Sequence, residues 1–173
     1  MILPECFVDT TLAETLSFPQ TKYGYKHKRS CTKVFVEMNK RTKDVLFGII
    51  DNDKEPPPAF NSFKLLKSHS ENLAIYKHND RQHYIVTIGR KGKAIEDFIL
   101  KNAEKCGISM LEHNLPDNLS ELIKLTKDIT TKNNPDLKRL FKAIKQNENS
   151  DFHTLSQWIE LFKANPYDFH AKI

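Results

Sequence analysis

The sequence predicts an α/β fold, in which helices flank a mostly parallel sheet and a helical C-terminal extension follows. Short apolar segments alternate with stretches of helical spacing through the first hundred or so residues, a pattern typical of α/β proteins. Residues 44–50 (DVLFGII) are continuously apolar after the first position, as in a strand buried on both faces of a parallel sheet. In the last third, apolar residues recur every three or four positions, which indicates helices.

The first elements are a strand and a helix. Residues 1–3 form the strand, which Pro4 ends, and residues 10–16 form a helix that Asp9 or Thr10 can cap.

Residues 30–41 fit either a helix or a strand. Helix is preferred because Ser30 suits the N-cap position. Residues 54–61 form a loop, since three consecutive prolines remove backbone donors. The remaining predicted elements are strands over 64–66, 73–77 and 83–88, a helix over 93–105 that stops at Gly107, and helices over 119–127, 135–146 and 152–164.

The length of 173 residues fits a compact protein of one main domain. We expect an α/β domain over residues 1–115 and a helical extension over residues 116–173 packed on it. The net charge of +5 and the pI near 9.0 suit a polyanionic partner without requiring one.

The sequence lacks the features of a membrane or secreted protein. No apolar run approaches the ~18 residues of a membrane span, and the N-terminus has no basic segment and carries an acid at position 5. Cys6, Cys31 and Cys106 are far apart, which predicts neither a disulfide framework nor a zinc site. We therefore expect a cytoplasmic protein without membrane contact.

Carboxylates follow two of the predicted strands. Glu5 and Asp9 lie between the first strand and its helix, and Asp51 and Asp53 directly follow the strongest strand. Ligands of open parallel sheets bind at the carboxyl ends of the strands, so both pairs should meet at one rim. Their mutual repulsion would be relieved by Mg²⁺ or Mn²⁺, which prefer oxygen ligands. The competing interpretation is that such acids only cap the next helix.

The spacing of these acids resembles the topoisomerase–primase (Toprim) domain. Glu5 corresponds to the glutamate of that family, Asp51 and Asp53 to its paired aspartates, and Asp9 to an acid of primase-like and OLD-nuclease-like members. Residues 45–53 (VLFGIIDND) resemble the second motif of small OLD-nuclease-like proteins. The resemblance implies a Toprim/Rossmann-like fold and metal-dependent phosphodiester chemistry on DNA or RNA.

The resemblance covers roughly residues 1–105 and extends to further groups. Glu96 resembles a downstream acid of OLD-nuclease-like members, and Lys91 or Lys93 can supply their basic group. Such proteins often belong to mobile-element or phage-defence systems. OLD proteins also carry an ATPase domain, but this sequence has no GxxxxGK[ST] motif, so an ATPase would be a separate partner.

Two positions depart from the family pattern. Cys6 replaces the glycine that follows the glutamate, and Pro4 replaces a usual strand residue. Cys6 places a side chain where the backbone usually makes a bare turn, which alters the expected geometry of the metal site.

Two basic segments are candidates for contacts with nucleic acid. Arg90, Lys91 and Lys93 surround two glycines before a helix and form either a phosphate clamp or a solvated turn. Residues 26–29 (KHKR), with Tyr23 and Tyr25, form either a backbone-binding and base-stacking loop or, as we prefer, an exposed basic loop.

The leading hypothesis is a metal-dependent nuclease or related phosphodiester-processing enzyme. Its Mg²⁺ or Mn²⁺ ligands are Glu5, Asp9, Asp51 and Asp53, with Glu96 assisting a second ion and Lys91 or Lys93 stabilising developing charge or helping to deprotonate water. The alternative is a catalytically inactive Toprim-like binding or regulatory subunit that acts with a partner such as an ATPase.

Overall fold

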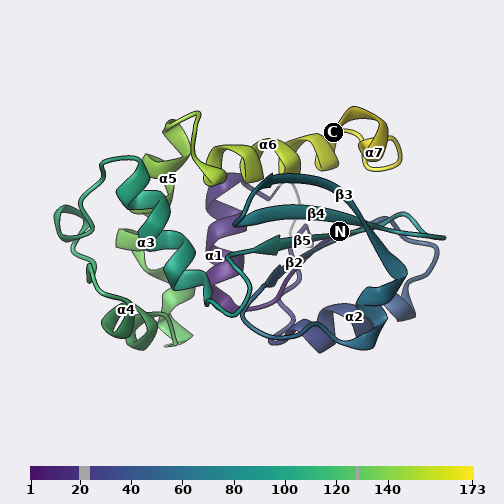
Figure 1. The fold of residues 1–173 in the computed structure, drawn as a ribbon, viewed down its shortest axis with the longest axis horizontal. Helices are drawn as coiled ribbons and strands as arrows, with labels where there is room; N and C mark the ends of the chain where they lie inside the picture. Colours follow the sequence, from purple (N-terminus) through teal and green to yellow (C-terminus); the bar gives the residue numbers. More distant parts are fainter. Residues whose placement is uncertain (20–23, 128) are drawn as a thin grey trace.

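The computed structural model describes residues 1–19, 24–127 and 129–173, and it confirms the predicted α/β class. One five-stranded sheet, ordered β1-β2-β5-β4-β3, has helices on both faces (Figure 1). The strands are β1 (Ile2–Pro4), β2 (Leu46–Asp51), β3 (Phe63–Ser70), β4 (Leu73–His78) and β5 (His83–Ile88).

The sheet has a parallel half and an antiparallel half. β1, β2 and β5 run parallel, with Leu3 opposite Gly48 and Gly48 opposite Ile85. β4 pairs antiparallel with both β5 and β3. The connections between β3, β4 and β5 are only a few residues long, which permits antiparallel pairing alone, because a parallel connection needs a long crossover.

Helices account for most of the rest of the chain. The α-helices are α1 (Phe7–Leu16), α2 (Cys31–Lys40), α3 (Ile95–Lys105), α4 (Leu119–Thr126), α5 (Pro135–Gln146), α6 (Asp151–Ala164) and α7 (Phe169–Lys172), and the 3₁₀ helices are η1 (Pro58–Ser62), η2 (Leu111–His113) and η3 (Ile129–Asn133). Within the described part of the chain, no helix combines the length and apolar character that crossing a membrane would require.

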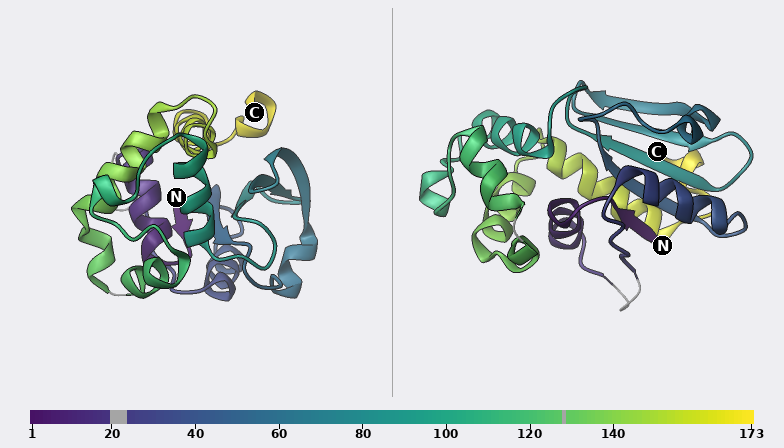
Figure 2. Two further views of the ribbon diagram at one scale, coloured as in Figure 1. Left: turned by 60° about the vertical axis from the view of Figure 1, so that its left-hand side comes forward. Right: turned by 90° about the horizontal axis from the view of Figure 1, so that it is seen from below.

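β2 explains how the two helical layers are arranged. Its side chains alternate between the faces of the sheet. Leu46 and Ile50 pack in a core cluster with α2, whereas Phe47 and Ile49 pack in a larger cluster with α1, α3, α5 and α6. Figures 1 and 2 show α2 on one face of the sheet and α6 on the other. The C-terminal helices therefore share a continuous core with the sheet.

Four sequence predictions need correction. Residues 58–61 of the predicted loop belong to the 3₁₀ helix η1, because a proline in the first turn needs no N–H partner there. β1 includes Pro4, which pairs with Ile49 and whose carbonyl accepts a hydrogen bond from Lys28 N, so its missing N–H does not end the strand. α1 begins at Phe7 rather than Thr10, because Cys6 provides the N-cap. β3 runs to Ser70 because pairing with β4 over its whole length outweighs its weak apolar pattern.

The basic segment before α2 lies along the open edge of β1. Ile2 N donates to Gly24 O, and Lys26 N donates to Ile2 O, each at 2.9 Å. This segment runs in the same direction as β1, as the parallel bridge between Ile2 and Tyr25 shows. It covers the sheet edge and brings His27 to Arg29 to the rim where β1 ends.

Candidate metal centre

The ends of β1 and β2 bring two of the predicted acids, Glu5 and Asp51, together. Glu5 follows β1 directly, and Asp51 is the last residue of β2. Glu5 N donates to Ile49 O at 2.9 Å, and Asp51 N donates to Glu5 Oε2 at 3.2 Å. Glu5 thus points toward Asp51, at the rim that the parallel topology predicts.

The start of α1 carries Asp9 to the same place. Cys6 N donates to Asp9 Oδ2 at 2.9 Å, and Asp9 N donates to Cys6 Sγ at 3.4 Å, which makes a capping box. The box folds the Asp9 side chain back toward the strand ends. One oxygen of Asp9, one oxygen of Asp51 and Cys6 Sγ all lie within 4.8 Å of one another.

Asp53 and Glu96 extend the cluster on either side. Glu96 lies in the first turn of α3, is nearly fully buried, and accepts a hydrogen bond from the hydroxyl of Thr126 on α4. Its charge contributes to raising the pKa values of Asp9 and Asp51. Asp53 is more exposed and contributes to raising the pKa of Glu5. All five predicted acids therefore affect one another's pKa values, but among the described residues only Asp9 and Asp51, with Cys6, form a group of ligand atoms within 4.8 Å of one another.

Burial and mutual repulsion disfavour the charged forms of these carboxylates. Burial, followed by the charge of Asp9, raises the pKa of Glu5 from 4.5 to about 7. Burial raises the pKa of Asp9 from 3.8 to about 6, although its hydrogen bonds with Cys6 oppose the change. Burial and then Asp9 raise the pKa of Asp51 well above its ordinary value. Crowded acids of this kind are found in metal sites and in catalytic sites.

Two oxygen atoms of the cluster have no N–H or hydroxyl donor, although the carboxyl groups of Asp9 and Asp51 lie close enough to share a proton. Asp9 Oδ1 and Asp51 Oδ1 are both buried and make no hydrogen bond. Buried carboxylate oxygens almost always have partners, so each such case needs an explanation. A bound cation would satisfy both atoms and would remove the repulsion between the two side chains.

The predicted basic group occupies the same rim without contacting the acids. The loop after β5 is tied to the loop after β2, because Gly92 N donates to Asn52 O at 2.8 Å. Gly89 and Gly92 both have positive φ, as the predicted turn requires. Lys91 pairs with Glu55 at 2.6 Å, and Lys93 is exposed to solvent. Neither lysine is placed against a carboxylate of the cluster.

The second basic segment is divided between structural and free groups. Lys26 and Lys28 pair with Glu37 at 3.0 and 2.8 Å, and their hydrogen bonds lower the pKa of Glu37 to about 2. Arg29 is exposed. Tyr25 is held internally by its hydrogen bond to Ser17 O, and Tyr23 lies outside the described residues.

His27 is placed against the start of α1. Its ring stacks on Phe7, with centroids 4.2 Å apart, and its Nδ1 lies 3.2 Å from Thr10 Oγ1. The hydroxyl of Thr10 already donates to Cys6 O at 2.8 Å, so it accepts from His27 Nδ1. Burial, followed by the charges of Arg29 and Lys132, lowers the pKa of His27.

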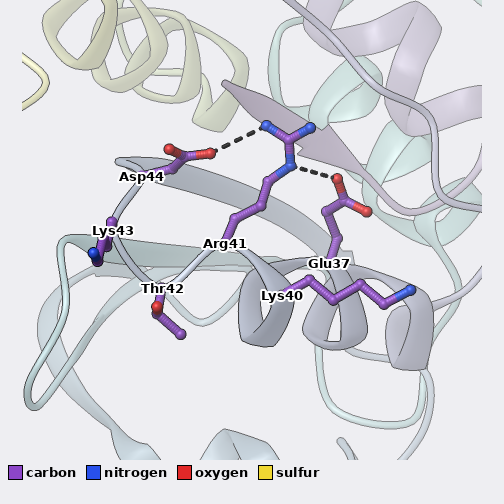
Figure 3. A pocket seen from close by; sticks show the side chains of 6 residues that line it. All are labelled: Glu37, Lys40, Arg41, Thr42, Lys43 and Asp44. Atoms are coloured by element: carbon purple, nitrogen blue, oxygen red, sulfur yellow. Dashed lines mark hydrogen bonds and ion pairs between the residues drawn. The ribbon is translucent and has the colours of Figure 1, made fainter.

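A surface pocket at the opposite rim of the sheet differs from the acid cluster in the charges that line it. The pocket encloses about 560 Å³ beside the end of α2 and the residues that precede β2 (Figure 3). Arg41 bonds to Glu37 at 2.8 Å and to Asp44 at 3.1 Å, and Lys40 and Lys43 give the lining more cations than acids. Asp44 precedes β2 whereas Asp51 ends it, and this pocket is therefore remote from the acid cluster.

Sequence reasoning missed two participants. Cys6 both caps α1 and borders the acids, although cysteine is not a usual N-cap residue. Thr126 reaches Glu96 from the C-terminal extension, a contact across thirty residues that no local pattern signals. Cys31 also lies near the cluster, since burial and then Glu5, Asp53 and Asp51 raise the pKa of its thiol to about 12.

Comparisons with models of protein families, with curated proteins and with solved structures gave no match to this chain. The chemistry of the site must therefore be argued from its own residues and distances.

Proposed function

We propose that this protein is a Mg²⁺- or Mn²⁺-dependent nuclease, or a related phosphodiester-processing enzyme, with a Toprim-type carboxylate site. The observation that carries the proposal is the pair of buried, unpartnered oxygens, Asp9 Oδ1 and Asp51 Oδ1, among further acids at the carboxyl ends of parallel strands. A site that only capped α1 would need Asp9 alone. It would leave the burial of Asp51 beside it as an uncompensated cost.

The donor set fits a hard divalent cation. Glu5, Asp9, Asp51 and Asp53 would hold it, and Glu96 would assist a second ion, since all offer carboxylate oxygens. When bound, such ions supply charge stabilisation at the oxygens of a phosphodiester and an activated water. Glu5 is oriented for this task by Asp51 N, and Glu96 is oriented by the hydroxyl of Thr126.

Basic groups on two sides of the cluster support nucleic acid, DNA or RNA, as the substrate. Lys93 is exposed on the loop that joins β5 to α3, and Arg29 and Lys132 are exposed near the start of α1. These positions would attract phosphates toward the acidic rim. Lys91 or Lys93 would stabilise developing charge, with Lys91 first released from Glu55. The three free thiols favour action in the reducing cytoplasm.

The direct test compares acids at the two ends of β2. We expect Asp51→Ala to lower Mg²⁺- or Mn²⁺-dependent cleavage of DNA or RNA by about two orders of magnitude or more, because it removes a buried metal ligand. Asp44→Ala, at the opposite rim, should retain cleavage. Circular dichroism should show both variants folded. Undiminished cleavage by Asp51→Ala would exclude the proposed role.

The alternative is a catalytically inactive Toprim-like subunit that acts with a partner such as an ATPase. It is favoured by the full burial of Asp9 and by the use of its other oxygen in the capping box. Metal binding without cleavage of any DNA or RNA tested would favour this alternative over the nuclease.

A further inference from the structure

A sulfur atom forms part of the wall of the acid cluster. Cys6 Sγ, one oxygen of Asp9 and one oxygen of Asp51 lie within 4.8 Å of one another, which makes a compact set of three ligand atoms. Cys6 and Asp9 come from the start of α1, and Asp51 comes from the end of β2. The set is thus held by two elements of the main core rather than by a loop.

The three ligand atoms of this set make few other hydrogen bonds. Asp9 Oδ1 and Asp51 Oδ1 are buried without a partner. Cys6 Sγ accepts the long 3.4 Å hydrogen bond from Asp9 N, and its thiol also bonds to the Asp9 carboxyl, so a metal ion would replace the thiol proton in that contact. Two buried carboxylate oxygens that no N–H or hydroxyl group reaches, beside a thiol, indicate independently that an ion binds between them.

The chemistry of this set differs from that of the carboxylates alone. Mg²⁺ seeks oxygen ligands, whereas Zn²⁺ binds thiolate and carboxylate together in tetrahedral sites. Zinc–sulfur and zinc–oxygen bonds of about 2.3 and 2.0 Å place tetrahedral ligand atoms about 3.5 Å apart. Because the three atoms here are at most 4.8 Å apart, a shift of about 1 Å or less would close the site. Water would take the fourth position.

We propose that Cys6, Asp9 and Asp51 form a thiolate-containing site for a Zn²⁺-class divalent ion, which shares its two aspartates with the proposed Mg²⁺ or Mn²⁺ centre. As the metal–sulfur bond forms, the Cys6 thiol releases its proton to solvent, and no electron transfer occurs. An ion held in this way occupies the carboxylates that a catalytic ion would need. The site therefore gives the protein inhibition by zinc, a consequence that rests on the proposed function, whereas the binding itself does not.

Cobalt is the spectroscopic probe for the binding. We expect titration of the reduced, metal-free protein with Co²⁺ to produce a thiolate-to-cobalt charge-transfer band that saturates at one ion per chain. Cys6→Ser should abolish the band, and Asp9→Asn should weaken its binding at least tenfold. Serine is itself a good N-cap, so Cys6→Ser keeps α1 capped, which circular dichroism verifies.

The other two cysteines supply matched controls. Cys31→Ser tests the second thiol near the acids, and Cys106→Ser tests a thiol at the end of α3. Both variants should keep the cobalt band. Absence of the band in the unmodified protein, or its survival in Cys6→Ser, would overturn the proposed site.

The inhibition is measured separately, by cleavage in Mg²⁺ with increasing Zn²⁺. We expect Cys6→Ser to need at least tenfold more Zn²⁺ for half-inhibition than the unmodified protein. Equal sensitivity of the two proteins to Zn²⁺ would contradict the proposed inhibition through Cys6. If the unmodified protein cleaves nothing in Mg²⁺, the proposed function fails while the cobalt band still decides the binding.

Discussion

At the scale of the residue, Asp51 should destabilise the metal-free protein. Its carboxylate is buried beside Asp9 and Glu5, and one of its oxygens has no partner. Asp51→Asn removes the charge while keeping the shape of the side chain. We expect the free energy of unfolding at neutral pH, with a chelator present, to rise by about 1–3 kcal/mol. Chemical denaturation measures this change, and a loss of stability in the variant would contradict the account.

The same residues predict a dependence on pH. Glu5 and Asp9 have pKa values raised to about 7 and about 6, so the folded state holds their protons more tightly than the unfolded state. Their contribution to stability is therefore present at low pH and is lost as the pH rises from about 4 to 7. His27, His78 and His83, whose pKa values are lowered by burial, act in the opposite direction.

Because of these opposing histidines, the informative quantity is the difference between Asp51→Asn and the unmodified protein. We expect this difference to be small near pH 4 and to grow toward pH 7, because over this range the unfolded carboxyl groups lose their protons while the folded state holds them. Saturating Mg²⁺ should reduce the difference, because it stabilises the unmodified protein more than the variant that binds it more weakly. A difference that did not change with pH would show that charge is not the cause.

At the scale of the element, the contact between β2 and α2 depends on Gly48. A Cβ atom at this position would lie 2.5 Å from Ile85 Cδ1 and 3.0 Å from both Met38 Cε and Val34 Cγ1. Gly48→Ala should therefore lower the free energy of unfolding by about 1–3 kcal/mol through overpacking. Val36→Ala, on the exposed face of α2, is the control and should change it by less than about 1 kcal/mol. An unchanged midpoint for Gly48→Ala would contradict this packing.

The elements that the sequence predicted well are those with strong local patterns. The strand over 83–88 and the helix over 135–146 match their observed bounds, because a short apolar run rich in branched residues marks the strand and helical apolar spacing marks the helix. The helix predicted over 30–41 depends on Ser30 as its N-cap, and Ser30 does accept a hydrogen bond from Lys33 N. The predicted start of α1 is wrong because the N-cap is Cys6, and cysteine is not a residue type that indicates an N-cap in a sequence.

At the scale of the whole molecule, topology explains why the acids could be found from the sequence. Parallel strands end at one rim, so Glu5 and Asp51 had to meet once both strands were recognised. How deeply these acids are buried could not be predicted in the same way. It depends on η3, which packs against α1, and on the packing of α3 against α4, which brings Thr126 to Glu96. The extension therefore completes the wall of the site.

The backbone pairing at the edge of the sheet also could not be predicted from local sequence patterns. Residues 24–28 form backbone bonds along β1, although their sequence reads as a polar loop without strand periodicity. This long-range pairing fixes which basic groups are committed to Glu37 and which stay free near the rim. The spacing of the basic residues does not indicate that Lys28 pairs with Glu37 whereas Arg29 stays exposed.

The central claim is that acids from separate elements share a divalent cation, and calorimetric titration of the metal-free protein with Mn²⁺ tests it most directly. We expect saturable binding that Asp51→Asn weakens by at least about tenfold, while Asp44→Asn at the far end of β2 binds as the unmodified protein does. Absence of binding in the unmodified protein, or equal binding in all three proteins, would contradict the claim.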